Sequence, residues 1–311
     1  MNATGSRGAF NAAIAMSLVG SSTAISATIV GYPLYSGQAI RYGIAALVLI
    51  AVLRIRRPTQ VQLKRSDYVR LAALAMTGLV GFNICLVEAT KHADLATIAT
   101  IVGAVPVVLA IAGPAMQRKG PNVRITIAAI IVLAGTALAS GTGTSSIVGL
   151  LLAVGALVGE VAFSLLAAPL IPRLGPLRVA TYPALMSVPM LLIAGIVVDG
   201  ADFLPVPTVS ETVALVYLGV IVTAVAFFLW YTAIARMGVD KAGLFAGLVP
   251  ASAIVTGTFI GMGVPEPSEL IACALVGIGI VLGIGRRLPR VIVQRRQRCD
   301  SARIRRLPTP G

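Results

Sequence analysis

The chain has 311 residues, of which 57% are hydrophobic and only 12% are charged, whereas about 25% of the residues in soluble domains are charged. Its mean hydropathy is +0.94. A soluble protein with so few charges could not cover its surface, so the composition excludes a cytosolic enzyme and indicates a polytopic helical membrane protein. The net charge of +14 would suit nucleic acid, but the basic residues form no patch interleaved with aromatic residues, and we predict no nucleic-acid partner.

Apolar stretches of about 20 residues predict an all-α protein with ten transmembrane helices. The predicted spans are 9–30, 33–53, 68–88, 94–115, 123–140, 147–169, 178–198, 211–235, 240–263 and 268–285. Arg7 and the apolar run after it also suggest a cleaved signal peptide, but the run exceeds the roughly 7–15 residues usual for one. We therefore keep this run as the first span, preceded by a cytoplasmic segment at 1–8.

The positions of lysine and arginine predict how the chain is oriented. With the N-terminus in the cytoplasm, 23 of the 25 basic residues fall in cytoplasmic segments, nine of them in a tail at 286–311. Lysine and arginine are enriched on the cytoplasmic side of membrane proteins. The sequence therefore predicts a multi-pass protein of the bacterial plasma membrane, or inner membrane, with both termini in the cytoplasm.

The chain also contains an internal repeat, because a shift of 144 residues aligns its two halves without a gap. The aligned pairs include Gly103 with Gly247, Pro106 with Pro250 and Gly113 with Gly257. The predicted repeats are 9–141 and 147–285, each with five spans. An odd number of spans inverts the second copy, and inverted repeats are typical of secondary transporters, which bind substrate between the repeats.

The segment from Ala39 to Leu47, Ala-Ile-Arg-Tyr-Gly-Ile-Ala-Ala-Leu, and the Gly-x-x-Pro in spans four and nine resemble the drug/metabolite transporter superfamily, EamA type. The resemblance covers about 9–285. It implies proton- or exchange-linked movement, often export, of amino acids, other small metabolites or drugs. The substrate itself follows only by analogy, because one fold serves many functions.

Two charged residues inside predicted spans are the first candidates for a substrate or proton pathway. A carboxylate such as Glu160 costs on the order of 3 kcal/mol within a membrane, so it marks either a functional site or a bonded pair of helices. Desolvation would allow Glu160 to bind and release protons. Arg41 could bind a carboxylate or phosphate, or could serve as a buried counter-ion or a snorkelling side chain. Glu160 and Arg41 lie at predicted membrane depths that would allow them to form an ion pair.

The backbone supplies a second set of candidates. Pro106 and Pro250 remove helix hydrogen bonds, which would leave free carbonyls toward a cavity, create hinges or kink the helices. Gly103 and Gly247 suit either such a cavity or close helix packing. The remaining polar and aromatic candidates are Gln38, Asn83, Tyr182, Trp230 and Tyr231. The alternatives for them are helix–helix hydrogen bonds for the two amides and an interfacial belt for the aromatic residues.

These observations predict a secondary transporter with a small-molecule substrate, no metal and no cofactor. Three cysteines and one histidine form no metal-ligand spacing. An intramembrane enzyme would need a cluster of acids, a histidine pair or a nucleophile with its base, which the spans do not supply. A non-transporting scaffold or receptor is the other alternative. Faces of small residues would permit a homodimer.

Overall fold

The computed structural model describes residues 3–29, 31–59, 61–140, 143, 145–200, 203–261 and 266–284, and the regular elements within them are helices. One isolated bridge, between Ala93 and Ser145, is the exception among these residues. The predicted basic tail at 286–311 lies outside the described residues. The prediction of an all-helical protein is confirmed for the part of the chain that the structure describes.

The elements follow one another with short connections. In chain order they are α1 (Ala3–Ala27), α2 (Leu34–Arg56), α3 (Arg65–Leu74), η1 (Ala75–Gly81), α4 (Phe82–Ala89), α5 (Leu95–Val102), α6 (Val105–Met116), α7 (Val123–Ser140), α8 (Ile147–Leu165), α9 (Ile171–Asp199), α10 (Val209–Tyr217), η3 (Leu218–Val225), α11 (Ala226–Met237), α12 (Val239–Gly243), η4 (Leu244–Gly247), α13 (Leu248–Phe259) and α14 (Pro267–Ile284). Among them η1 and η3 are π-helices and η4 is a 3₁₀-helix.

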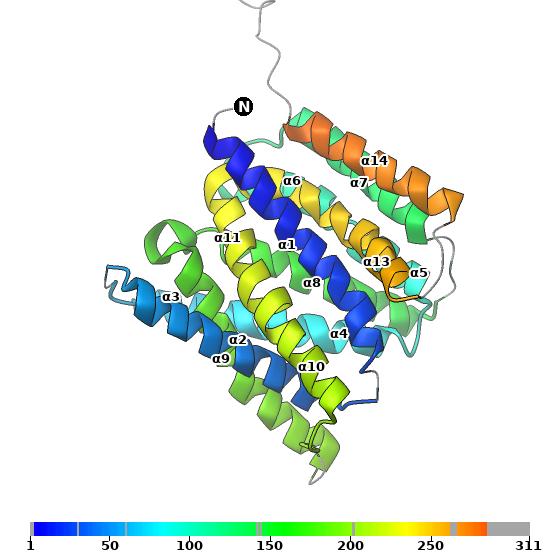
Figure 1. The fold of residues 1–311 in the computed structure, drawn as a ribbon. Helices are drawn as coiled ribbons and strands as arrows, with labels where there is room; N and C mark the ends of the chain where they lie inside the picture. Colours follow the sequence, from blue (N-terminus) through cyan, green and yellow to red (C-terminus); the bar gives the residue numbers. More distant parts are fainter. Residues whose placement is uncertain are drawn as a thin grey trace, which may run out of the picture.

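Each predicted span coincides with one helix or with consecutive helical segments. Eight of these segments are long and apolar enough to cross a membrane, and α7 contains a shorter apolar helix, Val123–Leu138. Helix α1 begins at Ala3, so part of the predicted N-terminal segment is helical. Helix α9 begins at Ile171, earlier than predicted, because a first turn precedes the non-helical Gly175 (φ 79°). The start of α1 and the end of α14 lie at the same end of the molecule (Figure 1).

The same irregularities recur at positions 144 residues apart. The π-helix η1 lies in span three, and η3 lies in the equivalent part of span eight. The bounds of α7 and α14 differ by 144 at both ends. Spans four and nine are both interrupted, between α5 and α6 and at η4. The sequence repeat is therefore also a repeat of helix geometry.

The contacts between the two halves come in matched pairs. Helix α7 packs against its counterpart α14, and α2 packs against its counterpart α9 (Figure 1). Helix α1 packs on α11 and α13, and its counterpart α8 packs on α4 and α6. An interface in which each contact has such an exchanged partner is self-complementary, as in a two-fold dimer.

Close packing accounts for the two repeated glycines. A Cβ atom at Gly247 would lie 2.2 Å from the Cγ1 atom of Val132, and one at Gly103 would lie 2.5 Å from the Cγ2 atom of Thr136. Both neighbours belong to α7. The structure thus places these glycines in helix contacts, the packing alternative that the sequence left open for them.

The repeated prolines do not interrupt continuous helices. Pro106 is the second residue of α6 and Pro250 is the third residue of α13. In the first turn of a helix the backbone N–H has no intrahelical acceptor, so a proline there costs little. The predicted kink within each span is therefore corrected to a break just before the proline, at which a new helical segment begins.

Candidate functional site

The side chain of Arg41 joins the two halves in the middle of the structure. It extends from α2, and its Nε donates a hydrogen bond of 2.7 Å to the Oγ1 atom of Thr223 in η3. The Thr223 hydroxyl in turn donates to the carbonyl of Leu218, at 2.8 Å and five residues back. A π-helix bonds i to i+5, so this hydroxyl bonds to its own π-turn. Arg41 is therefore held by an interhelical bond, and the alternative of a snorkelling side chain is excluded.

Tyr42 and Asn83 form a second link, this time within the first half. The Nδ2 atom of Asn83 donates to the Tyr42 hydroxyl at 2.8 Å and to the carbonyl of Leu79 at 2.7 Å. Leu79 belongs to η1, and Asn83 follows this π-helix directly. The Arg41 guanidinium lies 5.5 Å from the centre of the Tyr42 ring, within the range of a cation–π contact. The tyrosine therefore contacts both the amide and the cation.

Glu160 lies on α8, half-buried, and faces this group. Its carboxyl group is near enough to the side chains of Tyr42 and Tyr231 to interact electrostatically with both. Within the described residues it forms no ion pair with Arg41, so the possible pair between the two is not formed. Two opposite charges therefore lie near one tyrosine without neutralising each other directly.

Aromatic side chains of α8 and α11 form one wall of this region. The Phe163 ring lies 4.7 Å from that of Phe227 and 5.0 Å from that of Tyr231, measured between ring centres. Tyr231 donates to the carbonyl of Phe163 at 3.4 Å, and Trp230 donates to the Ser164 hydroxyl at 3.1 Å. Trp230 and Tyr231 are only 2% and 0% exposed. Both are therefore core residues, and the alternative of an interfacial belt is wrong for them.

We define the central polar cluster as Arg41, Tyr42, Asn83, Glu160, Thr223 and Tyr231. Of the other sequence candidates, Gln38 lies at its edge, because its Oε1 atom is 3.5 Å from Nη1 of Arg41. Tyr182 is half-buried on α9 and packs against the main hydrophobic core. The cluster draws residues from α2, α4, α8, η3 and α11, and thus from both halves.

The sequence analysis missed Tyr42 and Thr223. Tyr42 is the neighbour of Arg41, so its role depends on which face of α2 each residue occupies. Thr223 had a signal that could have been used, because it carries the only polar side chain between Tyr217 and Trp230 in span eight. The bond between Thr223 and Arg41 could not be predicted before the packing of α2 against η3 was known.

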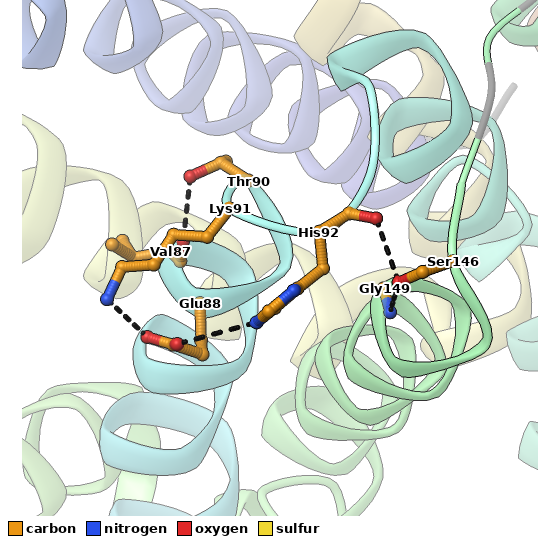
Figure 2. A network of polar contacts seen from close by, with 7 residues as sticks. All are labelled: Val87, Glu88, Thr90, Lys91, His92, Ser146 and Gly149. Atoms are coloured by element: carbon orange, nitrogen blue, oxygen red, sulfur yellow. Dashed lines mark hydrogen bonds and ion pairs between the residues drawn. The ribbon is translucent and has the colours of Figure 1, made fainter.

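A polar network at the other end of α8 fixes where that helix begins (Figure 2). The Ser146 hydroxyl donates to the carbonyl of His92 at 3.1 Å and accepts the N–H of Gly149 at 3.1 Å, which caps α8. Nearby, Nζ of Lys91 lies 2.8 Å from the Glu88 carboxylate, and that hydrogen bond and charge raise the pKa of Lys91. The network joins α4 to the start of α8 and so sets the position of the helix that carries Glu160.

The surface hollows and the acidic, histidine and sulfur-bearing side chains are the other candidates for a site. Two surface hollows of about 470 and 550 Å³ lie along α7. The second has an almost wholly apolar lining, and the first is mainly apolar but includes Asn122 and Arg124. Surfaces of that kind suit lipid tails. Over the described residues, no three His, Cys, Asp or Glu side chains gather as metal ligands would.

Two segments of the chain, 6–141 and 147–284, match the model of the EamA-like transporter family. The chain belongs to this family. The matched segments correspond closely to the two predicted repeats, and together they include every residue of the central polar cluster.

Individual relatives carry transporter names. The chain is 25% identical over 279 residues to the uncharacterized transporter YetK of Bacillus subtilis, covering 87% of this chain and 83% of that protein. It is 30% identical over 254 residues to a probable terminal-alkyne amino-acid exporter of Streptantibioticus cattleyicolor, covering 78% and 80%. A solved crystal structure, titled only as that of a protein, superposes with a TM-score of 0.79 at 20% identity and covers 94% of this chain. That likeness supports the fold alone.

Proposed function

We propose that this EamA-family protein is a secondary transporter that moves amino acids or related small metabolites across the bacterial plasma membrane by alternating access. Export coupled to protons or to exchange is the direction and mode that we favour. The observation that carries the proposal is the central polar cluster, which holds Arg41 and Glu160 at the junction of the two halves.

The proposal includes ten membrane spans in two inverted repeats, with α1 and α7 crossing as well as the eight longer apolar segments. The matched contacts between the halves support this, because they relate each half to the other as a two-fold axis would. Five spans in each half would place that axis in the membrane plane. The distribution of lysine and arginine supports a cytoplasmic location for both termini.

The charges of the cluster favour a solute with both an acidic and a basic group. A guanidinium binds a carboxylate through charge-assisted hydrogen bonds, and a carboxylate beside aromatic rings binds an ammonium group. Arg41 and Glu160 are not paired with each other, so each charge can bind the opposite charge of a zwitterion. The amino-acid exporter named among the relatives agrees with this substrate class.

Glu160 would also couple transport to protons. A carboxyl group that cannot hold a proton and an ammonium group together forces the two to alternate, which is the basis of antiport. This role is supported by the lack of an ion pair between Glu160 and any basic residue among the described residues. Its proton can therefore exchange with water whenever the cluster opens to either side.

The test is transport by the purified protein in liposomes that contain a pH-sensitive dye. Neutral amino acids are offered first, and then amphipathic cations and dicarboxylates. Wild-type protein should move a zwitterion with protons in the opposite direction. Glu160→Gln should abolish the proton movement, while exchange of labelled solute continues with a weaker apparent affinity because the charge that binds the ammonium group is lost. Glu88→Gln, an acid in the capping network of Figure 2, is the matched control and should retain coupling.

Two results would contradict the proposal at different points. Proton-linked flux that survives in Glu160→Gln would remove the coupling role of Glu160. A wild-type protein that moves none of the three solute classes, although it is folded and inserted, would remove the transport function.

A further inference from the structure

At the end of the molecule that the basic residues predict to be cytoplasmic, the two halves are joined by a set of polar contacts. This inner end carries the connection between α2 and α3 and the connection between α8 and α9. Arg173, in the first turn of α9, forms an ion pair with Asp67 in the first turn of α3. Its Nη1 atom also donates to the carbonyl of Gln62 at 3.3 Å. A single arginine thus holds the chain on both sides of the start of α3.

The side chain of Asp67 is also held by a hydrogen bond within its own segment. Its Oδ2 atom accepts the backbone N–H of Lys64 at 2.6 Å, which caps α3. The residue is only 4% exposed. The Asp67 carboxylate is thus buried, whereas 34% of the Arg173 side chain is exposed. Breaking the ion pair would leave the buried carboxylate without its partner charge, so the contact resists opening.

Arg178, five residues further along α9, adds a second attachment. Its Nη2 atom donates to the carbonyls of Pro58 at 3.2 Å and Thr59 at 2.5 Å, and its Nη1 atom donates to the carbonyl of Leu174 at 3.2 Å. The first two carbonyls belong to the first half and the third belongs to the second half. Both arginines therefore bridge the α2–α3 connection to α9.

The equivalent place at the outer end lacks these contacts, although its backbone is the same. The N–H of Thr208 is accepted by Glu211 at 2.7 Å, which repeats the capping by Asp67 at a distance of 144 residues. The positions equivalent to Arg173 and Arg178 are Ile29 and Leu34, which offer no charge. Among the described residues of these two connections, one hydrogen bond joins them, from the Tyr32 hydroxyl to the carbonyl of Pro205 at 2.8 Å.

We propose that Asp67, Arg173 and Arg178 form the gate at the inner end, and that this gate is closed in the present structure. The proposal rests on the proposed function, because a gate has meaning only for a protein that opens to each side in turn. Opening to the cytoplasm would require both arginines to release the α2–α3 connection. At the outer end, the equivalent connections are held among the described residues by one neutral hydrogen bond, so they would separate more easily than the inner ones. The contact of Ser146 with His92 joins other segments at that end.

The experiment measures how accessible a cysteine is behind the gate. Cys85, Cys273 and Cys299 are replaced by serine, and Thr181→Cys places a reporter one turn beyond Arg178 on α9. Thr181 is fully buried, and its hydroxyl bonds only to the carbonyl of Leu177 in its own helix. A membrane-impermeant maleimide is then added to inside-out membrane vesicles, which expose the cytoplasmic face.

The double variant Arg173→Gln/Arg178→Gln should raise the labelling rate at position 181 roughly tenfold, the change that a modest shift between two states produces. Asp67→Asn should raise it less, because the amide oxygen still accepts the N–H of Lys64 while the charge is lost. Glu211→Gln, at the equivalent outer position, is the matched control and should leave the rate at position 181 unchanged.

An unchanged labelling rate in both inner variants, each folded as judged by gel filtration, would overturn the gate. An equal increase in Glu211→Gln would overturn it as well, because the effect would then be a general loosening. Solute flux is measured in the same preparations. Flux with unchanged labelling would refute the gate and leave the transport function standing, whereas increased labelling without flux in any preparation would support the gate contact and refute the transport function.

Discussion

The two halves of the molecule share their backbone geometry and differ in their polar residues. Equivalent positions keep the interrupted fourth span, the π-helix and the tightly packed glycine. Every member of the central polar cluster, in contrast, has an apolar counterpart in the other half. The equivalent pairs are Arg41 with Leu185, Tyr42 with Met186, Asn83 with Phe227, Glu160 with Met16, Thr223 with Leu79 and Tyr231 with Val87.

The repeat preserves the glycine and proline positions, whereas the polar residues differ between the halves. Glycine and proline positions are preserved because they determine how closely the helices approach and where they break. The polar residues are not needed twice, since a single site at the junction receives one set of groups from each half. The inner gate follows the same pattern, because one end has arginines where the other has Ile29 and Leu34.

The largest expected effect, on solute flux, comes from replacing Arg41 by the residue that the second half has at the equivalent position. Arg41→Leu copies Leu185 and should lower flux of a carboxylate-bearing solute roughly 100-fold, because hydrogen bonds to charged groups contribute on the order of 1.5–3 kcal/mol. Flux is measured in liposomes. Arg41→Lys keeps the charge and should retain more flux than Arg41→Leu. Equal loss in both variants would show that the charge of Arg41 is not what binds the solute.

A smaller effect, on stability, is expected from substitutions at the glycines that both halves share. Gly247→Ala and Gly103→Ala should each destabilise the fold by about 1–3 kcal/mol, because the added methyl group overlaps α7 in both cases. The measurement is the thermal unfolding of the detergent-solubilised protein. Gly277→Ala in α14, where a Cβ atom meets nothing within 4 Å, is the control and should not destabilise the protein. Tolerance of alanine at either tight position would contradict the packing role assigned to the glycines.

The smallest effect tests the π-helices, which both halves share but use differently. Thr223→Val removes the hydroxyl that accepts from Arg41 and should raise the KM for transport roughly tenfold with little change in the maximal rate, since one hydrogen bond to a charged group is lost. Thr77→Val is the matched control in η1, because the Thr77 hydroxyl bonds only to the carbonyl of Ala73 in its own segment. A similar change in both variants would indicate a general effect of the π-turn and would contradict the positioning role of Thr223.

Much of the fold could be predicted from the sequence because the membrane constrains it strongly. Within a bilayer the backbone must satisfy its own hydrogen bonds, so a long apolar run is a helix. The limits of α7 and α14 followed from charges and glycines at their ends. The breaks before Pro106 and Pro250 were predicted as kinks, since the sequence shows a missing N–H but not where the preceding segment ends.

The candidate site was predictable only in part. Glu160, Arg41 and Asn83 were chosen because polar groups at membrane depth are costly, and this reasoning treats each residue alone. Tyr231 was chosen as an aromatic residue that could line a pocket. The partners of those residues come from helices that lie far apart in the sequence. The bonds of 2.8 and 2.7 Å that Tyr42 and Thr223 accept from Asn83 and Arg41 became known only from the structure.

The sequence by itself determined the helical class, the repeat of 144 residues and the presence of two charges within the spans, because hydropathy and backbone constraints are local properties. The tertiary structure alone decided that Arg41 bonds to Thr223, that Glu160 and Arg41 remain unpaired, and that Arg173 and Arg178 bind the α2–α3 connection. Those contacts depend on how two helices rotate and slide against each other, which the packing of the whole molecule fixes.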